Sequence, residues 1–202
     1  AASLWFNIKM AMVVALLVTA GDPEVTDVQR LFYLVYMALF VLITVIDIEH
    51  RLILFSVIIP ACALALLAAA LTPPGDRPTL ADALGGAALG FGVFFLLYLG
   101  GILFSYVIAK SRGQELPEVA FGYGDVMLAA LCGLIVGWQA LIFAMFITVF
   151  LGALGALVYL VGRGLTGRYD MFTPLPYGPY IVIGTWIMLL FSDQVRTLLW
   201  RL

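Results

Sequence analysis

The feature that most restricts the fold of this chain is a series of apolar runs long enough to cross a lipid bilayer. The longest covers residues 80–109, whereas about 20 helical residues suffice to span the hydrocarbon layer. Hydrophobic residues make up 64% of the chain and charged residues only 11%, against about 25% charged in soluble domains. A soluble core of this length would need more polar surface than this composition supplies. The sequence therefore indicates an integral membrane protein.

Polar and Gly/Pro-rich breaks divide the apolar sequence into seven candidate spans. These lie near residues 4–20, 31–47, 54–71, 80–109, 125–137, 138–161 and 179–191. The fifth is short for a full crossing, so it is either tilted, begins within the membrane or continues into the sixth. Unpaired backbone groups cannot face lipid, and the period of two expected of a barrel is absent. We predict an all-α polytopic membrane protein, a bundle of about six to seven transmembrane helices.

Charge and cysteine content exclude several classes of function. The Lys and Arg residues are scattered and form no basic cluster of the kind that binds nucleic acid. Cys62 and Cys132 lie in separate apolar runs without a CxxC pair, which predicts free, buried thiols and neither a disulfide framework nor a zinc site. Slightly more cations accompany the connections 49–52, 110–124 and 162–177 than the opposite side. The positive-inside rule predicts that these connections are cytoplasmic.

Two aspartates stand at the ends of apolar runs. Asp47 closes the second candidate span, and Asp125 opens the fifth directly after Gly122 and Gly124. The predicted topology brings both to the same membrane face. A carboxylate at mid-membrane depth costs about 2.5–3.5 kcal/mol on insertion scales, so it usually pairs, lines water or has a function. Each aspartate alone would be read as a polar residue reaching headgroup water, but the two together predict a catalytic dyad. We expect the glycines to supply backbone conformations closed to other residues and close approach of a substrate strand.

Three motifs together resemble those of the type IV prepilin peptidases, membrane aspartic peptidases of the GxGD class. The motifs are IDIEHRLI at residues 46–53, FGYGDV at 121–126 and PYGPY at 176–180. The resemblance implies that Asp47 and Asp125 are the catalytic pair. It also implies cleavage of the leader peptide from type IV prepilin or pilin-like precursors at the cytoplasmic face of a bacterial or archaeal cytoplasmic membrane. Leu54-Phe55 stands where many members have Pro followed by Asn or Asp.

The same resemblance bears on domain organisation. Bifunctional members carry an N-terminal cysteine-rich, zinc-binding segment associated with methylation of the new pilin N-terminus, and residues 1–202 contain no such segment. We therefore expect a single transmembrane aspartic peptidase domain over residues 1–202, either peptidase-only or a truncated bifunctional protein.

The expected mechanism needs no metal or organic cofactor. Two adjacent carboxyl groups share one proton, so the ionised member takes a proton from water while the protonated member donates to the scissile carbonyl oxygen. Asp125 is the expected base because a helix N-terminus favours negative charge. Two rival hypotheses remain open at this point: a proton-coupled transporter or channel that uses both carboxylates, and an inactive scaffold.

Overall fold

The computed structural model describes residues 27–50, 52–72, 78–112, 122–165 and 177–199, together with Lys9 and Val13. Those ranges contain five helices and no strand. The helices are α2 (Asp27–His50), α3 (Phe55–Leu71), α4 (Leu80–Arg112), α5 (Tyr123–Leu165) and α6 (Gly178–Leu199). Helices α2, α4 and α5 are long and apolar enough to cross a membrane, and α3 and α6 contain shorter apolar segments.

These helices confirm the predicted all-α class, and three of them are candidate membrane spans. Each candidate span from residue 31 onward coincides with a helix or with part of one. The first candidate span, 4–20, lies outside the described residues apart from Lys9 and Val13. The count of six to seven transmembrane helices therefore stays a prediction.

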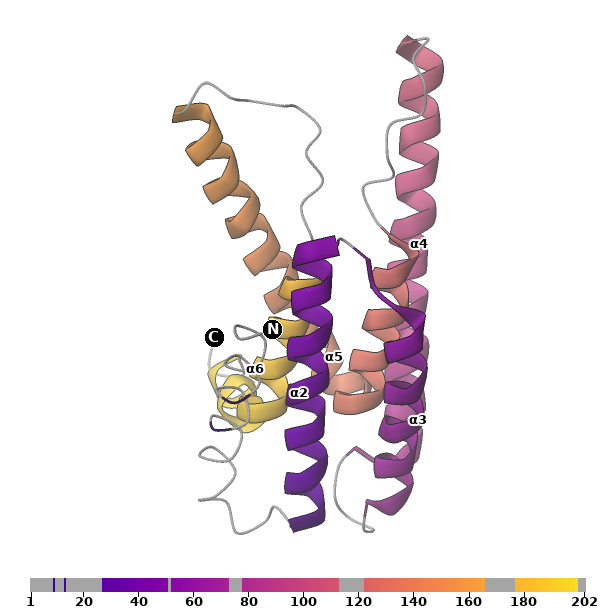
Figure 1. The fold of residues 1–202 in the computed structure, drawn as a ribbon, viewed down its shortest axis with the longest axis vertical. Coiled ribbons are helices and arrows are strands. Elements are labelled where there is room, and N and C mark those ends of the chain that lie inside the picture. Colours follow the sequence, from indigo (N-terminus) through magenta and orange to yellow (C-terminus); the bar gives the residue numbers. More distant parts are fainter. Residues whose placement is uncertain are drawn as a thin grey trace.

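The fifth and sixth candidate spans are the two arms of one bent element, α5 (Figure 1). The bend is at Gly137, whose φ of 77° and ψ of 166° lie in a region essentially reserved for glycine. The first arm, residues 123–136, is about 20 Å long at 1.5 Å per residue, shorter than the roughly 30 Å of a hydrocarbon layer. The structure therefore shows that the short fifth span continues into the sixth, with a change of direction at Gly137.

The start of α4 packs against this bend. Thr79 Oγ1 accepts a hydrogen bond from the Asp82 backbone N–H at 3.2 Å, and Asp82 Oδ2 accepts one from the Thr79 N–H at 3.3 Å. This reciprocal pair is a capping box, which satisfies free donors at a helix N-terminus. The other carboxylate oxygen, Asp82 Oδ1, accepts a hydrogen bond from Trp138 Nε1 at 3.1 Å. One side chain thus caps α4 and holds the residue that follows the bend.

Glycines bring the backbones of α4 and α5 into direct contact. A Cβ atom on Gly86 would collide with the Gly133 carbonyl, and one on Gly133 would collide with the Gly86 carbonyl. A Cβ atom on Gly90 would meet the Ala129 carbonyl in the same way, whereas one on Gly92 would meet no atom of the described residues within 4 Å. Small residues at such crossings permit the van der Waals contact that drives helix association in lipid. Gly86 and Gly90 thus permit the close packing of α4 on α5, whereas Gly92 takes no part in it.

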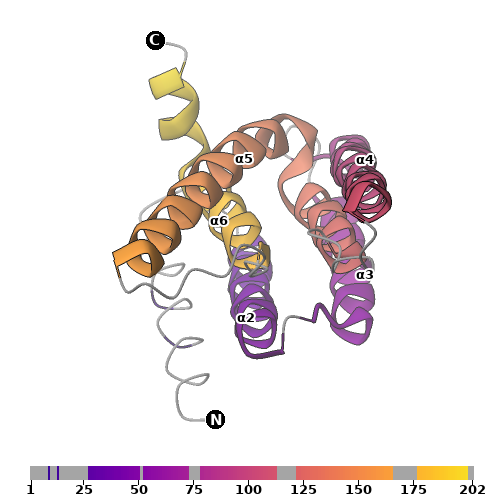
Figure 2. The same cartoon turned by 90° about the horizontal axis from the view of Figure 1, so that it is seen from above.

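The first arm of α5 contributes the largest part of the core. Its buried side chains are Val126, Leu128, Ala129, Leu131, Cys132, Leu134 and Ile135. Seen from above, α3 and α4 lie on one side with this arm, α2 and α6 lie side by side opposite, and the second arm of α5 joins the two groups (Figure 2). The arrangement places the last turn of α2 and the first turn of α5 in different groups of helices.

Candidate active site

Asp47 lies in the last turn of α2, which ends at His50. It is 6% exposed and is the one charged residue that is buried among those with described side chains. The backbone of Gly178, the first residue of α6, packs directly against Oδ2, so that a Cβ atom at position 178 would collide with this oxygen. Despite this contact, Oδ2 makes no well-formed hydrogen bond within the described residues. Asp47 is therefore enclosed by protein, and one of its oxygens remains available for a further partner.

Asp125 lies in the first turn of α5 and is half-buried. Its Oδ2 accepts a hydrogen bond from the Gly122 N–H at 3.2 Å, and its own N–H donates to the Gly122 carbonyl at 3.1 Å. Such a carboxylate occupies the favourable end of the helix dipole. The turn holds the carboxyl group at the N-terminus of α5, whose first arm is largely buried.

The expected role of the two glycines before Asp125 is partly wrong. Neither Gly122 nor Gly124 has a positive φ, the backbone conformation that would require glycine. Gly124 is instead restricted by space, because a Cβ atom there would lie 2.7 Å from Cβ of Ile53. Gly122 is exposed, and no such neighbour restricts it. The close contact at Gly124 joins the start of α5 to the segment between α2 and α3.

The two aspartates are 78 residues apart in the sequence, and in the structure the charge of Asp47 acts on the Asp125 carboxyl group. Tyr177, the residue before α6, lies near Asp125. The pKa of its phenol is raised mainly by burial and, to a smaller extent, by the charge of Asp125. Gly178 contacts Asp47, as described above. The start of α6 thus has one residue beside each carboxyl group.

An aromatic pair borders the Asp125 turn. The rings of Phe55 and Tyr123 lie 6.1 Å apart, and Tyr98 contacts the Tyr123 ring edge-on at 5.8 Å. Phe55 is 45% exposed and Tyr123 is 40% exposed. Phe55 is one of the two residues by which this chain departs from the pattern Pro followed by Asn or Asp, so the departure places an apolar ring beside the site.

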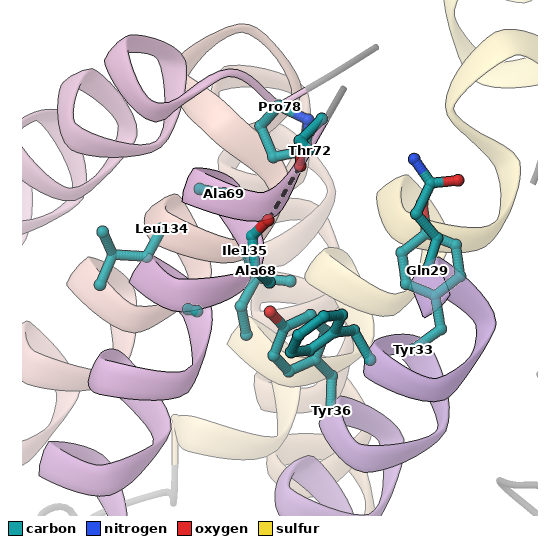
Figure 3. Close-up of a pocket in the computed structure, with 11 residues that line it drawn as sticks. Gln29, Tyr33, Tyr36, Ala68, Ala69, Thr72, Pro78, Leu134 and Ile135 are labelled. Atoms are coloured by element: carbon teal, nitrogen blue, oxygen red, sulfur yellow. Dashed lines mark hydrogen bonds between the residues drawn. The ribbon is translucent and has the colours of Figure 1, made fainter. Parts of the chain in front are cut away.

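A partly open cavity of about 40 Å³ lies away from both aspartates, with room for about three water molecules. It is lined by the first turns of α2, the last turns of α3, and residues Pro78, Leu134 and Ile135 (Figure 3). Tyr36, one of its lining residues, is about 16 Å from Asp47 along α2 at 1.5 Å per residue. The cavity is therefore separate from the candidate active site.

Sequence reasoning gave no role to Tyr177 or Gly178, although both lie in the third motif. The signal was a glycine between two prolines immediately before an apolar run, and nothing in that pattern indicates which residue the glycine meets. Pro174, Leu175 and Pro176 of this stretch lie outside the described residues. The two cysteines are free, as predicted, with Cys132 buried and Cys62 half-buried. The part of the chain that the structure describes has no group of three potential metal-ligating side chains.

Comparison with known proteins identifies relatives over most of the chain. Residues 34–157 match the model of the type IV leader peptidase family. A prepilin leader peptidase/N-methyltransferase of Stutzerimonas stutzeri is 32% identical over 153 residues, which are 75% of this chain and 46% of that protein. One of Aeromonas salmonicida (strain A449) is 30% identical over 92% of this chain and 56% of its own length. The leader peptidase HopD of Escherichia coli is 31% identical over 78% of this chain and 90% of its own length.

The chain spans about half the length of the Stutzerimonas and Aeromonas proteins. No solved structure matches it. The family match covers more than half of the chain and includes both aspartates. This chain therefore belongs to the type IV leader peptidase family, a family of membrane peptidases.

Proposed function

We propose that this protein is a membrane aspartic endopeptidase that removes the leader peptide from type IV prepilin or pilin-like precursors. The proposal assigns catalysis to Asp47 and Asp125 within a single peptidase domain over residues 1–202. The observation that supports it is that two carboxyl groups from distant parts of the chain, one buried at the end of α2 and one in the first turn of α5, lie close enough for the charge of Asp47 to act on Asp125. Family membership supports the choice of peptide hydrolysis over proton transport.

The two carboxyl groups would share one proton, because like charges at close range cannot easily both ionise. The ionised member removes a proton from a water molecule between them, and the protonated member donates to the scissile carbonyl oxygen. The hydroxide formed in this way adds to the carbonyl carbon as its oxygen is protonated, which gives a tetrahedral gem-diol without a covalent enzyme intermediate. Asp125 acts as the base, since the N-terminus of α5 favours its ionised form.

The substrate would reach this site from the membrane. A pilin-like precursor has a basic leader and an apolar helix, and the boundary between them lies where the helix leaves the bilayer. Asp47 and Asp125 are at helix ends, and the end of α4 carries the exposed Lys110. We assign this end of the bundle to the cytoplasmic face, in agreement with the slight excess of cations there. The leader would then stay in the cytoplasm while the apolar helix packs among lipid-facing helices.

The test compares wild type with Asp47→Asn and Asp125→Asn in detergent, using a purified pilin-like precursor. Each variant nearly preserves side-chain volume but removes the proton transfer. Asp27→Asn is the matched control, because Asp27 is on α2 as well, is exposed, and pairs with Arg30 at 3.1 Å. Wild type and Asp27→Asn should cleave the precursor, and both dyad variants should lose about 100- to 10,000-fold in kcat, in line with the contribution of acid–base groups.

The pH dependence of cleavage distinguishes loss of acid–base catalysis from loss of structure in the Asn variants. The pH profile of kcat/KM should rise and fall with two apparent pKa values that belong to the pair. Cleavage by either Asn variant at the wild-type rate would remove that aspartate from the mechanism. Proton flux into liposomes without any cleavage would favour the transporter instead.

A further inference from the structure

We propose that Gly178 is a positioning residue for Asp47: its missing side chain leaves the space that the Asp47 carboxyl group occupies at the dyad. This inference rests on the proposed function, because it assigns the third motif a part in building the same catalytic site. It concerns the shape of the site and not the chemical step.

The contact between the two residues is direct. Gly178 is buried, and a Cβ atom built on it would collide with Asp47 Oδ2 while lying 3.1 Å from Cγ and 3.6 Å from Cβ of Asp47. Its φ is not positive, so an alanine could adopt the same backbone conformation without strain. The requirement for glycine at this position is therefore one of space.

The start of α6 cannot easily withdraw to relieve such a collision. Tyr177 packs on Gly152 of α5 so closely that a Cβ atom at 152 would lie 2.9 Å from the ring. The Tyr180 hydroxyl likewise packs on Gly155. Thr148, which is buried, donates a hydrogen bond to the Tyr180 carbonyl at 3.2 Å. Three contacts thus fix the first turn of α6 against the second arm of α5.

Asp47 is the part that would move. Its side chain can change rotamer about Cα–Cβ, whereas the neighbouring atoms of α6 are backbone. A methyl group at position 178 would therefore turn the carboxyl group away from its present place and so change its distance from Asp125. Displacement of a catalytic group by about 1 Å can cost about 100-fold in rate.

Kinetics provide the first test. Gly178→Ala should lower kcat about 100-fold and leave KM close to that of wild type, because the collision affects the carboxyl group and not a substrate-binding surface. Gly100→Ala is the matched control, since a Cβ atom on Gly100 of α4 would meet none of the described residues within 4 Å, and this variant should cleave like wild type. A Gly178→Ala enzyme with unchanged kcat, or one with raised KM at constant kcat, would overturn the proposal.

Thermal unfolding provides a second test that does not need activity. Gly178→Ala should lower Tm in the wild-type background but not in an Asp47→Ala background, where the colliding carboxyl group is gone. An equal loss of Tm in both backgrounds would show that residue 178 meets something other than Asp47 and would refute the inference. Should wild type itself fail to cleave pilin-like precursors, the proposed function falls, while this comparison still decides the contact.

Discussion

The contact between the backbones of α4 and α5 leads to a prediction with a built-in comparison. Gly86 and Gly92 lie on the same helix. A Cβ atom on Gly86 would collide with the Gly133 carbonyl and lie 2.9 Å from the carbonyl carbon of Gly137. A Cβ atom on Gly92 would meet none of the described residues within 4 Å. Alanine at both positions makes the same chemical change. Only the surroundings differ.

The expected magnitudes follow from two opposing effects. Overpacking costs about 1–3 kcal/mol, and the upper end applies at Gly86 because the obstructing atoms are backbone and cannot rotate away. Alanine also favours a helix over glycine by about 1 kcal/mol. Gly86→Ala should therefore lose about 2 kcal/mol, while Gly92→Ala should gain up to about 1 kcal/mol. For a chain of this size, the Tm of Gly86→Ala should be about 4–8 °C lower than that of wild type, and the Tm of Gly92→Ala should be about 2–4 °C higher.

Thermal unfolding of both variants in the same detergent measures this difference. The sign of the Tm change should differ between them. Cleavage should follow stability, since α5 carries Asp125 in its first turn and a displaced α5 moves that carboxyl group. Equal Tm shifts for the two variants would refute the claim that backbone contact at Gly86 holds α4 against α5.

Two further predictions concern the bend in α5 and the aromatic pair beside the site. Gly137→Ala should lower Tm, because a side chain at this φ and ψ costs about 1–3 kcal/mol and its Cβ atom would lie 3.2 Å from Cβ of Pro78. Gly162→Ala is the control on the same helix and should not lower Tm, because a Cβ atom there would have open space around it. Phe55→Asn should raise KM for an apolar precursor about 2- to 10-fold, equivalent to an aromatic contact of about 0.5–1.5 kcal/mol, with little change in kcat. Steady-state kinetics would contradict this if kcat fell while KM stayed constant.

Local features of the sequence were sufficient to predict the class of fold and the position of most helices. Apolar runs indicated membrane helices because lipid excludes charged side chains and unpaired backbone groups. The break between the fifth and sixth spans was read from Gly137-Trp138, where the structure has its bend. The last candidate span was predicted to end at Phe191, where α6 leaves helical geometry with φ −131° and ψ 30°. Each of these signals depends only on neighbouring residues and on the solvent around them.

The sequence by itself also determined that Asp47 and Asp125 lie at helix ends, because each borders an apolar run. Only the tertiary structure decided what surrounds them: the backbone of Gly178 against Asp47, and Ile53 against Gly124. It likewise decided that Gly86 packs on Gly133, while a Cβ atom on Gly92 would meet none of the described residues within 4 Å. Glycines look alike in a sequence, and whether one is required depends on atoms that the fold brings to it from elsewhere in the chain. Such contacts depend on how the helices lie against one another, which the apolar pattern of a single helix does not specify.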